Sequence, residues 1–127
     1  MKKHPCIMTV DDDQGVLNLL KRVLEPEGYD VIVADNGTVA LELFEEYMPD
    51  LVILDIMMPG LDGFQVLGLI RQRISVPVIM LSAKREVSTV HDALVIGADD
   101  YVRKPFHTQE LLARVKTKLR RATVNSN

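Results

Sequence analysis

Three carboxylates follow directly after two short apolar runs of this chain. Residues 7–10 are followed by Asp11 and Asp12, and residues 51–54 are followed by Asp55. Parallel strands end at one edge of their sheet, and open α/β folds place their functional sites at that edge. We therefore expect Asp11, Asp12 and Asp55 to lie close together at the carboxyl edge of a sheet.

A hydroxyl and an ammonium group follow two later runs in the same way. Ser82 comes after the apolar residues 78–81, and Lys104, with Pro105 behind it, comes after residues 101–103. Carboxylate oxygens bind Mg²⁺, whereas hydroxyl and ammonium groups bind phosphoryl oxygens. These polar side chains together predict a site that holds a divalent cation and a phosphoryl group.

The acidic residues have the chemistry of a magnesium site. Mg²⁺ takes about six oxygen ligands in octahedral geometry and usually keeps several of its waters. We expect one carboxylate oxygen each from Asp12 and Asp55, a coordinated water held by Asp11, and the backbone carbonyl oxygen of Met57. Mn²⁺ would suit the same ligands. Because neighbouring carboxylates repel each other, a bound divalent cation relieves an electrostatic strain.

Asp55 is the candidate phosphoacceptor, because a carboxylate can attack a phosphoryl group and form an acyl phosphate. Lys104 and the cation would neutralise the charge on that group, and the Ser82 hydroxyl would bond another of its oxygens. Each residue alone has an ordinary explanation, since acids after strands often cap helices, as we expect of Asp13. Their combination at successive strand ends favours the phosphoryl site.

Short β-rich runs alternate with amphipathic segments along the whole chain. The expected strands are residues 5–10, 29–34, 50–55, 77–81 and 100–103. The expected helices are one near 16–24 that ends before Gly28, one at 37–47 capped by Asn36 and stopped by Pro49, one at 63–73 capped by Asp62, one at 86–96 that ends at Gly97, and one from about Thr108. Five βα units predict a doubly wound, five-stranded parallel sheet in the flavodoxin-like order 2-1-3-4-5.

Length and composition indicate a single α/β domain. The chain has 127 residues and a net charge of −3, which gives no general attraction to nucleic acid. We expect one domain over residues 1–121 and a polar tail or linker over 122–127. Cys6 is the only cysteine, so no internal disulfide forms. The chain has neither a membrane-spanning apolar stretch nor a signal peptide, and we expect a cytoplasmic protein.

The chain resembles the receiver domain of two-component response regulators over nearly all of residues 7–121. The matching motifs are Val-Asp-Asp-Asp at 10–13, Leu-Asp-Ile-Met-Met-Pro-Gly-Leu-Asp-Gly at 54–63, Leu-Ser-Ala at 81–83, Gly-Ala-Asp-Asp-Tyr at 97–101 and Lys-Pro-Phe at 104–106. The resemblance implies that a sensor histidine kinase donates the phosphoryl group and that Asp55 receives it with Mg²⁺. It also implies a cis peptide bond between Lys104 and Pro105.

The resemblance further implies a conformational switch rather than an enzyme that acts on an external substrate. The domain would assist only its own phosphorylation and dephosphorylation. Ser82 would move toward the phosphoryl group and Tyr101 would rotate inward behind it. The face formed by the fourth helix, the fifth strand and the fifth helix would then change, as new charge-assisted bonds bias a two-state equilibrium.

Residues 98–101 and 110–115 resemble the subfamily that carries a C-terminal winged-helix DNA-binding domain. Members of that subfamily tend to form homodimers through the switching face, and DNA would be bound only through a domain absent from this chain. The residues expected at the dimer face are Leu94, Asp99, Asp100, Glu110, Ala113, Arg114 and Arg121. Val90 stands where a basic residue is expected and leaves Glu110 without its usual partner. A solvated face is the other explanation of these charges.

Three other functions compete with this interpretation. The first is a stand-alone receiver that binds a partner protein, and the second is a receiver that has lost phosphorylation. The third is a phosphatase of the haloacid dehalogenase type, with Asp11 as nucleophile. Gly15 stands where that family usually has Thr or Val, its second acidic pair would precede Lys104 rather than follow it, and Asp55 would have no role.

Two side chains that flank the site bear on the lifetime of the phosphoryl group. Met57 lies two residues after Asp55 and offers no good hydrogen bond to an attacking water. We therefore expect a lifetime of minutes or longer. Lys84, two residues after Ser82, can oppose this effect.

Overall fold

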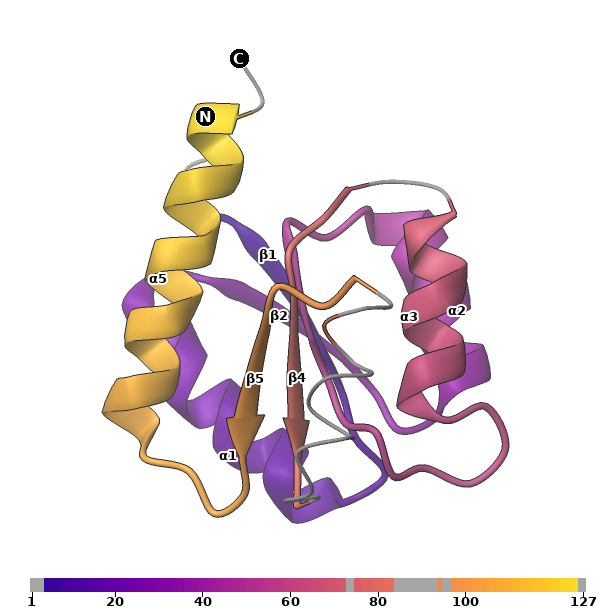
Figure 1. The fold of residues 1–127 in the computed structure, drawn as a ribbon. Helices are drawn as coiled ribbons and strands as arrows, with labels where there is room; N and C mark the ends of the chain where they lie inside the picture. Colours follow the sequence, from indigo (N-terminus) through magenta and orange to yellow (C-terminus); the bar gives the residue numbers. More distant parts are fainter. Residues whose placement is uncertain (1–3, 73–74, 84–93, 95–96, 126–127) are drawn as a thin grey trace.

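The computed structural model describes residues 4–72, 75–83, 94 and 97–125, with side chains described to residue 121. Its five parallel strands form one sheet in the order β2-β1-β3-β4-β5, which confirms the flavodoxin-like prediction (Figure 1). The strands are β1 (Cys6–Val10), β2 (Asp30–Ala34), β3 (Leu51–Leu54), β4 (Val78–Ser82) and β5 (Asp100–Arg103). This order places β1 and β3 side by side at the centre of the sheet and β5 at one edge.

Helices cover both faces of the sheet (Figure 1). They are α1 (Gln14–Leu24), which continues into the short 3₁₀ helix η1 (Glu25–Glu27), α2 (Gly37–Tyr47), α3 (Gly63–Arg71) and α5 (Thr108–Asn125). The fourth helix predicted at 86–96 lies, except for Leu94, outside the described residues, as does the predicted end of the third helix at Arg73. Helix α5 reaches Asn125 and so extends into the segment that we expected to be a tail.

The predicted caps fix where three helices begin. Asp13 accepts hydrogen bonds from the first turn of α1, and Asn36 accepts one from the Val39 N–H at 2.9 Å. Asp62 and Gln65 form a reciprocal capping box at the start of α3. These side chains satisfy N–H groups that a helix leaves without internal partners. They therefore hold the loops that follow β1, β2 and β3 in defined conformations.

Two apolar clusters, one on each face, hold the helices to the sheet. Met8 and Val10 of β1 belong to the cluster under α2 and α3, whereas Ile7 belongs to the cluster under α1 and α5. Because side chains alternate along a strand, β1 fills both cores at once. This double burial explains why the central strands are apolar without alternation, and it anchors the strand end that carries Asp11.

Thr9 is a weak point of this core. It is fully buried in β1, and its hydroxyl has no hydrogen-bond partner. A buried polar group without a partner costs about 1–3 kcal/mol. We expect Thr9→Val, which keeps the shape and removes the hydroxyl, to raise the free energy of unfolding by about 1 kcal/mol in urea denaturation. The control is Thr117→Val, because Thr117 already donates to the Ala113 carbonyl at 2.9 Å. A loss of stability in Thr9→Val would contradict this explanation.

Met48 ends α2 in a strained backbone conformation. Its φ of 46° lies in the left-handed region, yet its side chain is 62% exposed and packs little. The left-handed region costs a residue with a Cβ about 1–2 kcal/mol, whereas glycine adopts it freely. We expect Met48→Gly to raise the melting temperature, with a gain in stability of about 0.5–1 kcal/mol. Met48→Ala keeps the strain and should give no gain, so equal gains would refute the cause proposed here.

Candidate functional site

The carboxyl ends of β1 and β3 bring the three predicted acids together. Asp55 follows β3, and its N–H donates to the Val10 carbonyl at 2.9 Å, which fixes it beside the end of β1. The carboxylate oxygens of Asp11, Asp12 and Asp55 lie within 4.8 Å of one another. Asp11 and Asp55 are buried, and Asp12 is exposed. The site is therefore an acidic cluster with one side open to solvent.

Lys104 reaches this cluster from the carboxyl end of β5. Its N–H donates to the Ser82 carbonyl at 2.9 Å, and its peptide bond to Pro105 is cis, as the resemblance implies. The ammonium nitrogen lies 2.7 Å from Asp11 Oδ2 and 3.5 Å from Asp55 Oδ1. Lys104 therefore bonds Asp11 directly, and its ammonium lies close enough to Asp55 to contact a group added there.

Asp11 and Lys104 hold each other in place. The Asp11 carboxylate accepts from the Asp13 N–H at 2.9 Å through one oxygen and from Lys104 through the other. Burial lowers the pKa of Lys104, but the bond to Asp11 and the charges of Asp55 and Asp11 outweigh it, and the pKa lies above its usual value. The ammonium is therefore charged at every physiological pH and provides a fixed positive group at the site.

The Asp55 carboxylate is electrostatically strained. Its side chain is only 5% exposed. Burial, followed by the charge of Asp11, raises the pKa of Asp55 to about 6, and Lys104 offsets only part of this rise. The ionised form is thus disfavoured while no cation is bound. Together, the carboxylates of Asp11, Asp12 and Asp55 offer three hard oxygen donors, which fit Mg²⁺ or Mn²⁺. No other group of three or more potential metal ligands occurs among the described residues.

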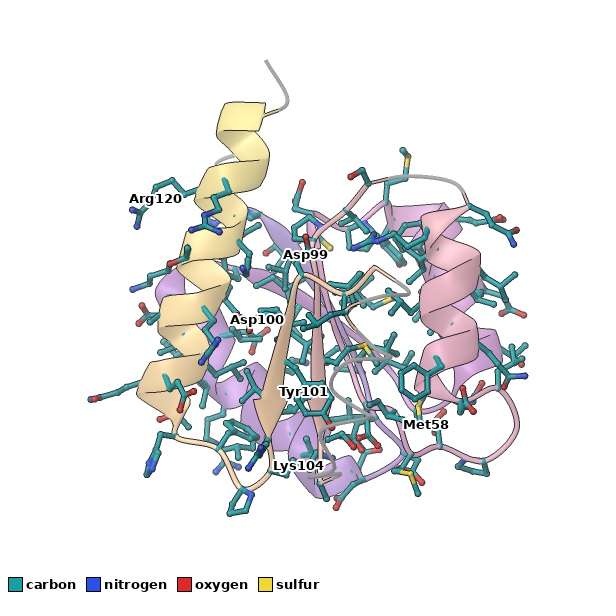
Figure 2. The ribbon with its side chains drawn as sticks, in the orientation of Figure 1. Met58, Asp99, Asp100, Tyr101, Lys104 and Arg120 are labelled. Atoms are coloured by element: carbon teal, nitrogen blue, oxygen red, sulfur yellow. The ribbon has the colours of Figure 1, made fainter. Side chains whose placement is uncertain are left out.

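The remaining predicted site residues, Ser82, Tyr101 and Met57, differ in how deeply they are buried. Ser82 is the fully buried last residue of β4. Tyr101 is half-buried on β5 and packs against the core cluster under α2 and α3 (Figure 2). The Met57 side chain is 54% exposed, two residues beyond Asp55. The structure therefore places the hydroxyl on β4, between the strands that lead to Asp55 and Lys104, the aromatic ring on β5 and the exposed thioether in the loop after β3.

Most charges predicted at the dimer face form ion pairs within the chain. Asp99 pairs with Arg71 at 2.8 Å, and Arg114 pairs with Asp100 at 2.7 Å and with Glu110 at 3.1 Å. The other described residues of the predicted face are exposed, and these are Leu94, Ala113 and Arg121. Val90 lies outside the described residues. A contact between two copies would therefore meet acids that already have partners.

Sequence reasoning did not predict the ion pair between Arg71 and Asp99. An arginine in the last turn of a helix is ordinarily explained by the helix dipole, and its spacing gives no sign of a contact with the residues before β5. The same reasoning gave Gly63 no role beyond its places after a helix cap and at the end of the 54–63 motif. A Cβ at Gly63 would collide with the backbone of Asp55 and Ile56. The available signal in the sequence was a glycine at the first helical position, because glycine lets two backbone segments approach closely.

The structure also has a bearing on membrane association. Among the described residues, no helix has the length and apolar character needed to cross a membrane.

Known proteins match this chain over almost its full length. A sequence model of the response regulator receiver domain matches residues 7–116. The receiver domain of the Francisella response regulator 1452 is 38% identical with a TM-score of 0.89, covering 93% of this chain and 98% of that one. The BeF3-activated N-terminal receiver domain of Klebsiella pneumoniae RstA is 35% identical with a TM-score of 0.87, covering 91% and 98%. A CheY-like receiver domain protein from Methanospirillum hungatei is 30% identical with a TM-score of 0.91, covering 96% and 98%.

The matching proteins and the geometry of the site indicate the same family. The similar proteins share the doubly wound fold over the whole domain, and the acidic cluster with its lysine lies at the carboxyl edge of the sheet, where this fold places its sites. This chain therefore belongs to the response regulator receiver domain family, the phosphorylation-controlled switches of two-component systems.

Proposed function

We propose that Asp55 is the phosphoacceptor of this receiver domain and that a sensor histidine kinase is its donor. The observation that carries the proposal is the position of Asp55, buried among two acids with the Lys104 ammonium 3.5 Å away. In the transfer, an Asp55 oxygen attacks the phosphorus of a phosphohistidine. The phosphorus–nitrogen bond breaks, its electron pair stays on the imidazole nitrogen, which takes a proton from solvent, and an acyl phosphate remains on Asp55.

The ligands proposed for Mg²⁺ or Mn²⁺ are the carboxylates of Asp12 and Asp55, Asp11 through a water, and the Met57 carbonyl. A cation held by these residues would supply positive charge to the phosphoryl oxygens. Lys104 would supply a second positive charge from the carboxyl end of β5, because its ammonium lies 3.5 Å from Asp55 Oδ1. The buried Ser82 hydroxyl, on the strand between β3 and β5, is proposed to bond a third oxygen once the phosphoryl group is present.

The output is proposed to follow from Ser82 and Tyr101. A shift of Ser82 toward the phosphoryl group would leave space for the Tyr101 ring, and the surface around β5 and α5 would change with it. The domain would then act through a homodimer at that surface and through a DNA-binding domain that is absent from this chain. The RstA receiver domain, which is 35% identical to this chain, is described as N-terminal, and this description is consistent with the proposal of a further domain after the receiver. A stand-alone receiver that binds a partner protein in the cytoplasm is the other candidate.

Phosphorylation by acetyl phosphate tests the proposed chemistry. We expect the wild-type protein to be phosphorylated with Mg²⁺ and not with EDTA. Lys104→Met should slow the reaction by about a hundredfold, because one of the charges that stabilise the transition state is lost. Arg120→Gln is the matched control, since Arg120 is an exposed cation near the opposite end of α5 from Lys104 (Figure 2). Equal rates in wild type and Lys104→Met would refute the role given to Lys104.

The phosphorylated protein is expected to decay slowly. The exposed Met57 side chain cannot hold a water in line with the phosphorus, so the acyl phosphate should last minutes or longer. We expect Met57→Asn, whose amide can orient a water, to shorten the lifetime by about tenfold in a phosphate-release assay. Met57→Leu should leave the lifetime unchanged. Decay of the wild type within seconds would contradict the expectation.

A further inference from the structure

Strand β5 carries Lys104 to the site, but its position in the sheet has little support from other strands. It is four residues long and pairs with β4 alone, with Ile79 opposite Asp100 and Ser82 opposite Arg103. A register shift of one residue would turn every side chain of the strand to the opposite face. The position of the Lys104 ammonium therefore depends on whatever fixes the start of β5.

Arg71, the last residue of α3, bonds the segment that leads into β5 from one face of the sheet. Its Nε donates to the Gly97 carbonyl at 2.8 Å, and a terminal nitrogen donates to Asp99 Oδ2 at 2.8 Å. The same Asp99 oxygen accepts from the Val78 N–H at 2.8 Å, and the Asp99 N–H donates to the Val78 carbonyl at 2.8 Å. One guanidinium thus ties α3, the segment before β5 and the first residue of β4 together.

The backbone at Gly97 is shaped to receive Arg71. Gly97 has a φ of 127°, and a Cβ there would come within 3.1–3.2 Å of the Arg71 side chain. The remaining Arg71 nitrogen is buried without a partner, so the guanidinium is drawn out of solvent to make the other two bonds. The planar fork of arginine can serve a carbonyl and a carboxylate at once, which a single ammonium cannot do in the same way.

Arg114 of α5 bonds Asp100, the residue after Asp99, from the opposite face of the sheet. It donates to both oxygens of Asp100, at 2.7 and 2.8 Å, and its fork also bonds Glu110. Helices α3 and α5 lie on opposite faces of the sheet (Figure 1). Arg71 therefore bonds Asp99 from one face, and Arg114 bonds Asp100 from the other. These two aspartates stand at the start of the strand that leads to Lys104.

We propose that Arg71 and Arg114 are positioning residues that fix the register of β5 and thereby the reach of Lys104 to Asp11 and Asp55. The proposal rests on the function given above to Lys104. It assigns Asp99, Asp100 and Arg114 a role inside each chain, in addition to any contact between copies. Arg71 is the decisive residue, because it links α3, whose first residue lies against the Asp55 backbone, to the strand that brings the lysine.

Amide hydrogen exchange tests the register without any phosphorylation. The Lys104 N–H, bonded to the Ser82 carbonyl, reports the pairing of β5 with β4. Arg71→Gln should speed its exchange by about tenfold, while the Val52 N–H, bonded to Pro77 in the sheet interior, keeps its rate. Arg120→Gln, which removes an exposed cation from α5, should change neither. Unchanged Lys104 exchange in a folded Arg71→Gln protein would overturn the proposal.

Phosphorylation kinetics then test whether Arg71 acts through Lys104. Arg71→Gln should slow phosphorylation by acetyl phosphate by about tenfold in the wild-type background, as expected for a misplaced charge. In the Lys104→Met background the same change should slow it by less than about twofold, although both changes lower the melting temperature additively. An equal slowing in the two backgrounds would show a general structural defect and overturn the proposal.

Two further results separate the possible failures. If Arg71→Gln does not fold, Arg71→Lys is measured, and it should show smaller changes in the same direction in both assays, because it keeps only one of the two bonds. If the wild-type protein is not phosphorylated on Asp55, the proposed function fails while the exchange experiment still decides the register. If wild type is phosphorylated and the folded Arg71 variants match it, only the present inference fails.

Discussion

Gly63→Ala is expected to lower the free energy of unfolding by about 3 kcal/mol, at the upper end of the cost of overpacking. A Cβ at Gly63 would lie 2.6 Å from the Ile56 Cα and would collide with the Asp55 carbonyl oxygen. Both obstacles are backbone atoms of the loop after β3, and that loop is held by the Gly63 N–H bond to the Ile56 carbonyl at 2.9 Å. Neither can move without displacing Asp55.

The matched control is Gly68→Ala in the same helix. No atom lies within 4 Å of a Cβ at Gly68, and alanine favours the helical backbone by about 0.5–1 kcal/mol. Urea denaturation should therefore show a gain in stability for Gly68→Ala and a large loss for Gly63→Ala. The surviving folded fraction of Gly63→Ala should also be phosphorylated slowly, because Asp55 is displaced. Similar stabilities of the two variants would show that α3 does not press on the Asp55 loop.

Without a divalent cation, the charge on Asp55 is expected to destabilise the folded protein. Burial and Asp11 raise the pKa of Asp55 to about 6 in the folded chain, above its ordinary value of 3.8. Between pH 4 and 6 the folded state keeps a proton on Asp55 that the unfolded chain has lost. The contribution of Asp55 to the free energy of unfolding therefore falls as the pH rises through that window. Above pH 6 the full penalty applies. We expect Asp55→Asn in EDTA to be more stable than wild type by about 1–2 kcal/mol at pH 7.5.

Denaturation of both proteins from pH 4 to 8 measures this effect, because groups other than Asp55 largely cancel in the difference. The difference should shrink toward zero near pH 4. Mg²⁺ at a hundred times its dissociation constant should stabilise the wild type by about 2.7 kcal/mol. Asp55→Asn has lost a proposed ligand and should gain much less. An Asp55→Asn protein that is less stable than wild type in EDTA at pH 7.5 would contradict the electrostatic account.

The sequence allowed the sheet order and the helix caps to be predicted because both depend on short-range patterns and a general winding rule. Apolar runs identify strands, and Asp13, Asn36 and Asp62 stand where a helix needs a side-chain acceptor. Residues at the carboxyl ends of neighbouring parallel strands must meet, which is why the amino-acid sequence was enough to place Asp11 and Asp55 together. Their chemical roles remain predictions.

Other features depend on distances that no pattern encodes. The closer bond of Lys104 to Asp11, at 2.7 Å, than to Asp55, at 3.5 Å, follows from how β5 sits in the sheet. Arg71 bonds Gly97 and Asp99, which lie 26 and 28 positions further along the chain. An arginine in a helix gives no sign of either contact. The extension of α5 to Asn125 was missed because a polar segment can continue a helix whose other residues hold it in place.

Intact mass spectrometry after incubation with Mg²⁺ and acetyl phosphate tests the assignment of Asp55 most directly. The wild-type protein should gain one phosphoryl group, about 80 Da, and Asp55→Asn should gain none, because an amide cannot form the acyl phosphate. Circular dichroism of both proteins confirms that each is folded. A folded wild-type protein without the added mass, or the same gain in Asp55→Asn, would contradict the assignment of Asp55 as the phosphoacceptor.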